Sequence, residues 1–475
     1  MATRKALLGN RIRRLRQERE LTQQQMAERL GISPSYLNLI EHDERPMTVA
    51  LLLKLGQAFN VDLQELSDDA ERRLALNLRE VFADPGLSAS DVDADEIRQL
   101  VASAPKAGRA VVELYRAWRT AREDAQALSL GLPSGTTKRI VLPTEEARDF
   151  FEARGNYFPA VEQAAEAFGR DAELAPATLE RSLVERLATR HGITVQIVSL
   201  DQDSQILRRF DPRGRTLALS EVLPRPSRNF HLAYQIGLLE AREVFDQTIA
   251  AAKLESPESE TLCRVGLANY FAGAVMMPYQ PYLRAAQTLR YDVEGLMHRF
   301  RVSFEQACHR LSNLQRPGDA GVPFFFLRAD SAGNIIKRFS AAGFHFSRFG
   351  GSCPRWVAHE AFGTPGLIRT QIARLPDGAT FFCIARTVER PGGSFHTPPT
   401  RYAIGLGCDV TRGSELVYAD GLDLTRLDAV TEIGVGCRLC ERENCRQRAF
   451  PPLQHRLVVD EKVKGPSAYS FDSSR

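Results

Sequence analysis

The segment LTQQQMAERLGISPSYLNLIE, residues 21–41, decides the architecture of the first part of the chain. It opens with Thr22 and Gln25, the T-x-x-Q pattern of a capping box, which predicts a helix from this point to about Leu30. Gly31 follows, and glycine is the residue that most readily takes the positive φ with which helices end. A short helix with a defined stop is therefore predicted.

A second helix is predicted directly after the turn. Ser33 is a good N-cap, and Pro34 suits the first helical position because its fixed φ fits the helix. Apolar residues recur at helical spacing, so that the two helices can pack together: Met26, Ala27, Leu30, Leu37 and Ile40. Two short helices joined by a tight turn form a helix-turn-helix, whose second helix enters the major groove of DNA.

Residues 9–66 resemble the phage-repressor-like (XRE-type) helix-turn-helix family, and the resemblance implies which side chains contact DNA. The implied DNA-binding residues are Arg11, Gln23, Ser33, Ser35, Tyr36, Asn38, Leu39, His42 and Arg45. Asn38 can form paired hydrogen bonds with adenine and Leu39 can contact a thymine methyl group, whereas Gln23 is expected at a phosphate. The alternative is a small helical bundle with ordinary solvated charges.

Length and composition bound the rest of the chain. Its 475 residues predict about three domains, and 43% hydrophobic with 25% charged residues is typical of a globular protein. No run of about 18 apolar residues occurs, and the basic N-terminus lacks the apolar stretch of a signal peptide. We therefore expect a cytoplasmic protein with reduced thiols that does not bind membranes.

The distribution of charge and the local sequence patterns predict a multidomain α+β protein. Residues 1–20 carry seven Lys or Arg against two Glu, and residues 61–100 carry eleven Asp or Glu against four Arg, which is typical of a DNA-facing end followed by a segment that faces away. We predict an all-α head at 1–66, a helical linker at 67–144, a mostly helical middle domain at 145–318, an α+β C-terminal domain at 319–460 and a flexible tail at 461–475. Within the linker, a helix at 106–128 is expected either to contact a second copy or to pack within one subunit.

Two segments of the middle domain, RNFHLAYQIGLLE (228–240) and GLANYFAGAVMMP (266–278), resemble zinc-peptidase-like domains of the ImmA/IrrE type. That family binds zinc through two His at i and i+4 of one helix, with a Glu between them as general base and an acidic ligand on a second helix. The corresponding positions here hold Tyr234, Leu238, Gln235 and Gly266–Leu267. The resemblance thus implies a zincin-like fold without its zinc or its hydrolytic activity, and His231 is expected in the core or a pocket.

Three cysteines gather in GCRLCERENCRQRAFPP, residues 436–452. Cys437, Cys440 and Cys445 have C-x2-C-x4-C spacing, which can hold a metal or a cluster, and Cys408 or Cys353 is the candidate fourth ligand. The interleaved arginines are expected to lower the thiol pKa values. An iron–sulfur cluster, a zinc ion, reduced structural thiols and a redox-active pair all fit this spacing.

The C-terminal region resembles the corresponding domain of the short-chain fatty acyl-CoA regulators through GGSCPRW, LPDGATFFCIART, LVYADGLDL and CRLCERENCRQRAFPP. These bacterial transcription factors have the same order of DNA-binding head, peptidase-like domain and cysteine-bearing domain. The resemblance implies control of propionyl-CoA or acetyl-CoA metabolism, with an acyl-CoA as effector, and it favours an iron–sulfur cluster at the cysteines.

Coenzyme A requires cations for its phosphates, a flat surface for adenine and an apolar slot for the acyl group. The candidate ligand-binding residues are Phe230, His231, Tyr234, Gln235, Lys337, Arg338, Phe344, Phe346, Arg348, Arg355 and Trp356. The segment ILRRFDPRGR, residues 206–215, is a further candidate for anion contact, and its alternative is a solvated hairpin.

These patterns predict a homodimeric transcriptional regulator that binds a palindromic DNA operator and has no catalytic residue. Two alternatives belong to other classes. The first is an iron–sulfur or redox sensor that uses the C-terminal cysteines and needs no acyl-CoA. The second is a zinc protease that cleaves a repressor.

Overall fold

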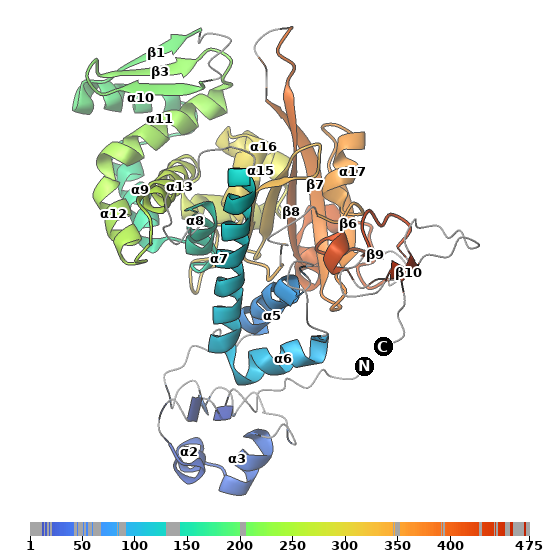
Figure 1. Cartoon of the computed structure of the whole chain (residues 1–475). Helices are drawn as coiled ribbons and strands as arrows, with labels where there is room; N and C mark the ends of the chain where they lie inside the picture. Colours follow the sequence, from blue (N-terminus) through green and yellow to red (C-terminus); the bar gives the residue numbers. More distant parts are fainter. Residues whose placement is uncertain are drawn as a thin grey trace. The chain divides into compact units, whose positions relative to one another are not determined.

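The computed structural model forms two compact units, Met1–Lys138 and Arg139–Arg475 (Figure 1). The structure describes residues 12–13, 15–16, 19, 21–41, 45, 51, 54–55, 59, 68–82, 84, 92–129, 143–199, 206–344, 346, 352–390, 392, 395–426, 430–440, 442, 445–451, 457–458 and 470–471. Of the predicted site residues, Arg11, His42 and Arg348 lie outside this set. No helix in the described part of the chain is long and apolar enough to cross a membrane.

The first unit begins with the predicted helix-turn-helix. Its helices are α2 (Gln23–Leu30) and α3 (Pro34–Glu41). The Thr22–Gln25 capping box forms, and Gly31 ends α2 with φ +68°. Nine apolar side chains form the core of this head: Ile12, Met26, Ala27, Leu30, Leu37, Ile40, Leu51, Leu55 and Phe59. The expected caps, turn and packing are therefore confirmed.

Three further helices complete the described part of the first unit. They are α5 (Asp68–Phe82), α6 (Ala94–Ser103) and α7 (Pro105–Ser129). The helix predicted over 106–128 corresponds to α7, which packs on α5 and α6 and buries Val112 and Tyr115. Leu114 is 72% exposed on another face of α7. The predicted dimer contact remains a prediction, and this face is where it would lie.

The second unit contains a helical part, a three-stranded sheet and a six-stranded sheet (Figure 1). Its α-helices are α8 (Pro143–Glu152), α9 (Pro159–Asp171), α10 (Leu179–His191), α11 (Arg225–Glu240), α12 (Arg242–Ala250), α13 (Pro257–Met276), α14 (Tyr279–Thr288), α15 (Val293–Phe300), α16 (Phe304–Leu311) and α17 (Val357–Glu360). Short 3-10 helices are η1 (Ala361–Gly363), η2 (Val410–Glu415), η3 (Val417–Ala419) and η5 (Cys437–Leu439). The all-helical head, the mainly helical middle and the α+β C-terminal part agree with the predicted fold class.

The strands form three sheets. A small sheet has the order β1-β3-β2, from β1 (Thr194–Val198), β2 (Arg208–Asp211) and β3 (Thr216–Ser220), with β1 parallel and β2 antiparallel to β3. The large sheet has the order β5-β4-β8-β7-β6-β9, from β4 (Phe325–Ala329), β5 (Ile335–Ser340), β6 (Arg369–Arg374), β7 (Thr380–Arg390), β8 (Thr400–Asp409) and β9 (Val430–Glu432). Strands β10 (Leu457–Val458) and β11 (Ser470–Phe471) form an antiparallel pair. The flexible tail predicted at 461–475 remains a prediction; of its residues the structure describes Ser470 and Phe471, which pair with Val458 and Leu457.

The two faces of the large sheet have different environments, because successive side chains of a strand point to opposite faces. On β4, Phe326 belongs to the core that it shares with the helices, whereas Phe325 and Leu327 belong to a separate core with α17 and Trp356. We call the first the helix face and the second the cysteine face, because Cys353 lies in the second core. The core of the helix face contains residues from both sides of residue 318. The domain boundary predicted at that residue remains a prediction.

A buried ion pair ties three helices of the second unit together. Arg310 on α16 donates two hydrogen bonds to Glu162 on α9, at 2.9 and 2.6 Å, and Tyr270 on α13 donates a third at 2.7 Å. The side chains of Arg310 and Glu162 are 2% and 0% exposed. Burial acts to lower the pKa of Arg310, but Glu162 holds it above the ordinary arginine value.

We predict that Glu162→Gln lowers the free energy of unfolding by about 3–5 kcal/mol, because it leaves the Arg310 charge buried without a counter-ion. Glu166→Gln is the matched control: its carboxylate on the same helix pairs with Arg316, but both side chains are about a quarter exposed, so about 1 kcal/mol or less is expected. Urea unfolding followed by Trp356 fluorescence, in a Trp118→Phe background, measures both. Equal losses for the two variants would contradict the assignment.

Candidate DNA-binding and ligand-binding sites

The recognition helix α3 is held by a polar network at its C-terminal end. Gln23 donates its amide to Asn38 Oδ1 at 3.1 Å and to Glu41 Oε2 at 2.8 Å, and Arg16 Nε donates to Glu41 Oε1 at 2.7 Å. Burial acts to raise the pKa of Glu41, but hydrogen bonds from Arg16 and Gln23 hold it below the ordinary value. Gln23 therefore fixes the orientation of the Asn38 amide, and its predicted phosphate contact would require an exchange of partners.

The other described candidates for DNA binding lie on α3 or beside it. Ser33 accepts the backbone N–H of Tyr36 at 3.1 Å and so caps α3. Ser35 and Asn38 are exposed on α3, Tyr36 and Leu39 are half-buried, and Arg45 is exposed. The face of α3 that carries Ser35 and Asn38 is thus available to a groove, which is the arrangement that base contacts require.

An arginine lies against the former catalytic helix. On α11, Tyr234 and Gln235 are buried where the peptidase-like family has a ligand histidine and the general base. The Arg208 guanidinium donates to Gln235 Oε1 and lies 4.5 Å from the centre of the Tyr234 ring. Residues 206–215 lie in the β2–β3 hairpin, whose turn is exposed, and Arg208 is the residue of this segment that reaches α11. Its role as an anion contact remains a prediction.

The second helix of the former zinc site has no room for an acidic ligand. A Cβ atom at Gly266 on α13 would lie 2.3 Å from Cζ of Phe151, so any side chain there would displace the Phe151 ring. His231 is largely buried, and burial together with Arg208 and Arg390 lowers its pKa to about 4. His231 thus lies near two arginines with its neutral form favoured, and its expected place in the core or a pocket remains a prediction.

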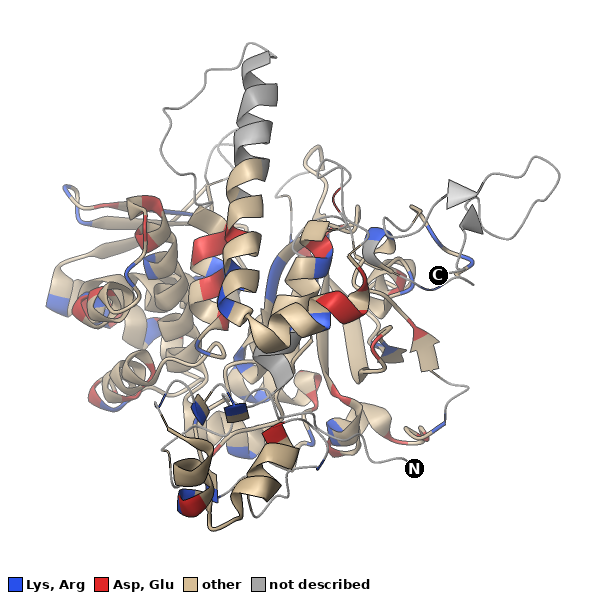
Figure 2. Ribbon diagram, turned by 60° about the horizontal axis from the view of Figure 1, so that its bottom comes forward, with Lys and Arg blue, Asp and Glu red and all other residues tan. Residues whose placement is uncertain are grey.

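Cations form a row across the helix face of the large sheet. Lys337 on β5 pairs in register with Arg328 on β4, Arg328 pairs with Ile404 on β8, and Ile404 pairs with Arg386 on β7. Residues in register share a face, so three positive side chains lie in one line with only Ile404 between them. Figure 2 colours lysine and arginine blue. We call Lys337, Arg328 and Arg386 the cation row.

Burial makes this row unusual. The Nε atoms of Arg328 and Arg386 are buried without a hydrogen-bond partner among the residues that the structure describes. Burial, with Arg328 and Arg390 nearby, lowers the pKa of Lys337 to about 8, against the opposing effect of Glu305. Like charges opposite one another in a sheet are unfavourable, and buried donors without acceptors are costly. A bound anion would relieve both.

An apolar row lies beside the cation row. Phe339, Phe326, Leu406 and Ile384 are in register across β5, β4, β8 and β7. His309 of α16 packs edge-on against Phe326 and Phe339, at 5.3 and 5.0 Å between ring centres. Its Nε2 atom is buried without a partner in the described residues, and burial holds its pKa well below the ordinary value. The helix face thus places a row of cations next to a buried apolar core.

Several predicted ligand residues lie on the other face. Phe344 and Trp356 are each 3% exposed and stack at 4.9 Å between ring centres in the core of the cysteine face. Phe346 packs against both rings, and the Arg338 guanidinium lies 5.8 Å from the centre of the Phe346 ring. The backbone carbonyl of Arg355 accepts a hydrogen bond from Gln371 beside this core. Arg338, Phe344, Phe346 and Trp356 thus lie on the opposite face of the sheet from Lys337, and their assignment to an acyl-CoA site remains a prediction.

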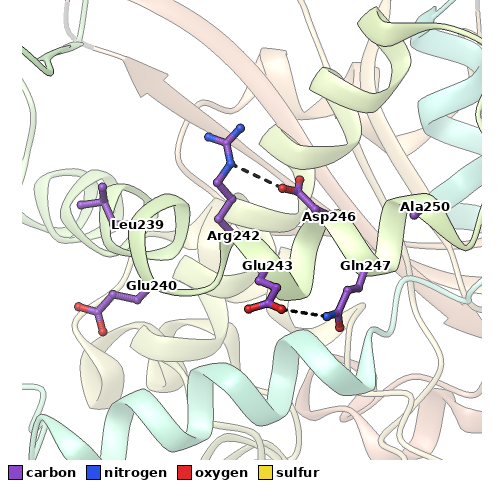
Figure 3. A pocket seen from close by; sticks show the side chains of 7 residues that line it. All are labelled: Leu239, Glu240, Arg242, Glu243, Asp246, Gln247 and Ala250. Carbon is purple, nitrogen blue, oxygen red and sulfur yellow. Dashed lines mark hydrogen bonds and ion pairs between the residues drawn. The ribbon is translucent and has the colours of Figure 1, made fainter.

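A surface groove of about 700 Å³ lies on α11 and α12 and holds none of the predicted ligand residues (Figure 3). Its lining is Leu239, Glu240, Arg242, Glu243, Asp246, Gln247 and Ala250. The carboxylates are already engaged: Asp246 pairs with Arg242 and Arg264, and Glu240 pairs with Arg186 and His191. An acidic lining repels phosphate, so this groove is a poor site for a coenzyme A ester.

Four cysteines influence one another on the cysteine face: Cys353, Cys437, Cys440 and Cys445. Cys353 interacts electrostatically with Cys437 and Cys445, and Cys440 interacts with Cys353 and Cys445. Cys408 lies in the core of the helix face and has Cys383 as its cysteine neighbour. Of the two predicted candidates for fourth ligand, Cys353 lies on the face of the other three cysteines, whereas Cys408 lies in the core of the opposite face.

Backbone groups surround these sulfurs. The N–H groups of Gly434 and Arg355 donate to Cys353, and that of Arg442 donates to Cys440. Burial raises the pKa of Cys440, and it outweighs the lowering effect of Arg448 that the sequence predicted. Arg448 instead donates to the carbonyls of Cys437 and Cys440, both at 3.0 Å, and so shapes the loop.

Coordination chemistry can be tested against this arrangement. No group of three His, Cys, Asp or Glu side chains within the described ranges is arranged to hold one metal ion. In a four-iron cluster each cysteine binds a different iron, so the sulfurs are further apart than the ligands of one ion, and hydrogen bonds to the sulfurs adjust its potential. The absence of such a group among the described residues argues against a single zinc ion held by these four thiols, and it does not bear on a cluster of that kind.

Three family models together cover most of the chain. Residues 12–66 match a helix-turn-helix model, residues 188–312 match the IrrE N-terminal-like domain, and residues 313–469 match the C-terminal model "Short-chain fatty acyl coenzyme A regulator". The HTH-type transcriptional regulator RamB of Mycobacterium tuberculosis is 43% identical over 98% of both chains. The chain belongs to the short-chain fatty acyl coenzyme A regulator family.

Other members of this family are similar over nearly their whole length. The propionyl-CoA carboxylase regulator of Cereibacter sphaeroides is 42% identical, covering 98% of this chain and 99% of that protein. The transcriptional regulator PrpR of M. tuberculosis is 41% identical, covering 97% and 95%. A solved M. tuberculosis transcriptional regulator is 42% identical with a TM-score of 0.66, covering 70% of this chain and all of that one. These relatives are named as transcriptional regulators, not as enzymes.

We predict that Asn38→Ala weakens binding to a selected operator by about 1–3 kcal/mol, through lost discrimination at one base position. Fluorescence anisotropy with the operator, its single-base variants and unrelated DNA at one salt concentration measures this. Gln23→Ala should give a smaller loss at the same position, because it removes only the orienting hydrogen bond. If Asn38→Ala weakens binding equally to all sequences, Asn38 contacts the DNA backbone and the assignment is wrong.

Proposed function

We propose that this chain is a cytoplasmic, homodimeric regulator of short-chain acyl-CoA metabolism whose effector is a short acyl-CoA. The family membership and the names of its relatives support the metabolic role. The helix-turn-helix head supports binding to a palindromic operator, since such heads act in pairs on half-sites about one helical turn apart. The exposed face of α7 around Leu114 is the candidate dimer contact.

The cation row is the observation that carries the effector proposal. Coenzyme A is a polyanion, and arginine binds phosphate oxygens in pairs through its planar fork. Arg328, Lys337 and Arg386, with Arg390 beside them, place positive charge on one face with buried donors that lack partners. A ligand that brings phosphates would supply the missing acceptors.

The apolar row supports the acyl part of the proposal. Phe326, Phe339 and His309 pack together in a dry core beside the cations, and Phe326 is 0% exposed, so a small alkyl group would have to open this core to bind there. Extending an acyl chain by one methylene changes binding by only about 1–3 kcal/mol, so such a site would discriminate between chain lengths by steps of roughly ten- to a hundredfold. The site would therefore respond to several short thioesters in graded fashion.

We predict that propionyl-CoA raises the unfolding temperature of the second unit, since a ligand at 100 times its Kd stabilises the native state by about 2.7 kcal/mol. Acetyl-CoA, butyryl-CoA and free coenzyme A form the comparison series. Lys337→Gln should reduce the shift, whereas Arg401→Gln, on the opposite face of β8, should not. Trp356 fluorescence during heating measures the transition.

The pH dependence of this shift adds a second criterion. Lys337 is charged below its pKa of about 8, and a bound phosphate favours the charged form, so affinity should fall as the pH rises through 8. Lys337→Gln should remove that fall. A folded protein that binds DNA but shows no shift with any thioester would contradict the effector proposal and favour the cysteines as the sensing site.

We also propose that Cys353, Cys437, Cys440 and Cys445 hold an iron–sulfur cluster, which would supply redox or iron sensitivity when bound. The shared neighbourhood of these thiols and the N–H donors around them support this assignment. The cluster would tie the loop at 437–445 to the segment at 353, so it would stabilise the cysteine face whatever its regulatory role.

We predict that Cys353→Ser abolishes the broad visible absorption of protein purified without oxygen and lowers its iron content, whereas Cys408→Ser leaves both unchanged. Cys408 is buried in the other core, so its replacement by the similar serine tests the assignment without touching the cluster residues. Retained absorption in Cys353→Ser, or loss in Cys408→Ser, would overturn the assignment.

A further inference from the structure

A carboxylate already lies on the cation row. Glu305 on α16 accepts a hydrogen bond from Arg328 Nη1 at 2.8 Å through one oxygen and from Arg390 Nη2 at 3.4 Å through the other. Its side chain is 21% exposed. Each oxygen therefore binds a different guanidinium, which is how a single phosphate group would bridge the same two arginines.

An aromatic ring keeps the two arginines together. The guanidinium groups of Arg328 and Arg390 each lie 5.2 Å from the centre of the Tyr402 ring. Stacking on an aromatic ring restrains a guanidinium without using its hydrogen-bond donors. The pair is thus preorganised, and its donors remain available to whichever anion lies there.

Negative charge on this face is too small to balance the cations. Arg328, Lys337, Arg386 and Arg390 face Glu305 and, at the margin, Glu294, which pairs with Arg386 at 2.9 Å and is 55% exposed. Glu305 is therefore the principal buried counter-ion of the row in this part of the described structure. Any incoming phosphate must either share the arginines with it or displace it.

We propose that Glu305 is an internal competitor for the effector site: its carboxylate occupies the Arg328–Arg390 pair in the unliganded protein, and the phosphates of the ligand displace it. This inference rests on the proposed function, since it assumes that a phosphate-bearing ligand binds to the cation row. It adds that Glu305 sets the affinity for this ligand and that α16 is the helix that responds to binding.

The position of Glu305 connects displacement to a helix. Glu305 lies in the first turn of α16, which Ser303 caps, whereas Arg310 near the other end is fixed by the buried ion pair with Glu162. Displacement of Glu305 releases the first turn of α16 from β4 and β7, while the last turn stays anchored. The ligand then binds two states of α16 with different affinity, which is the requirement for an effector.

The test is calorimetric titration of the full-length protein with coenzyme A, and with pyrophosphate as a probe of the phosphate contact alone. Glu305→Gln keeps the size of the side chain and removes its charge, so coenzyme A should bind about tenfold more tightly than to the wild type. Glu389→Gln is the matched control, because this carboxylate pairs with Arg401 on the opposite face of the same strands. It should leave the affinity unchanged.

Each result has one meaning. Tighter binding by Glu305→Gln but not by Glu389→Gln supports the competition. Equal binding by the wild type and Glu305→Gln overturns it and leaves the effector proposal intact. Absence of binding by all folded variants, with any acyl-CoA, overturns the effector proposal itself. If Glu305→Gln does not fold, Glu305→Asp is the second variant. Its shorter side chain moves the carboxylate away from Arg390, which has the longer contact. The Glu305→Asp protein should therefore bind coenzyme A more tightly than the wild type, but by a smaller factor than expected for Glu305→Gln.

Discussion

Alternation of side chains across the large sheet is the constraint on which the rest of this account depends. On β4, Phe326 and Arg328 point toward the helices, whereas the alternate residues Phe325 and Leu327 point toward the cysteines. A single sheet therefore carries two kinds of chemistry on opposite faces, a cationic and apolar face under α16 and a thiol-bearing face beside α17. A shift of one residue in the register of β4 would exchange them.

The sheet also couples the two sites physically. Strands β4, β7 and β8 contribute to both cores, so movement of α16 on one face and closure of the cysteine loop on the other act on the same strands. The helical part reaches the sheet through a shared core and through ion pairs such as Arg290 with Asp420 and Arg386 with Glu294. The peptidase-like part thus packs on the helix face of the sheet, and Arg208 lies against Tyr234 and Gln235 of α11.

Sequence patterns predicted local features well, because these depend on neighbouring residues. The Thr22 capping box, the Gly31 stop and the loss of the zinc ligands at Tyr234 and Leu238 all follow from short segments. The ligand and cluster residues depend on strand register instead, which a single sequence does not specify. The sequence therefore leaves Cys408 and Cys353 as equal candidates and does not separate Trp356 from Lys337, which lie on opposite faces; nor does it single out Arg328, Arg386 and Glu305. The alternation of arginine with aromatic residues around β4 and β5 was the one available signal.

A crystal structure of the full-length protein with propionyl-CoA tests the central claim most directly. The account predicts phosphate density at Arg328 and Arg390 on the helix face, the acyl group near Phe326 and His309, and Glu305 turned away from both arginines. Density for the ligand on the cysteine face, or in the groove along α11 and α12, would contradict it.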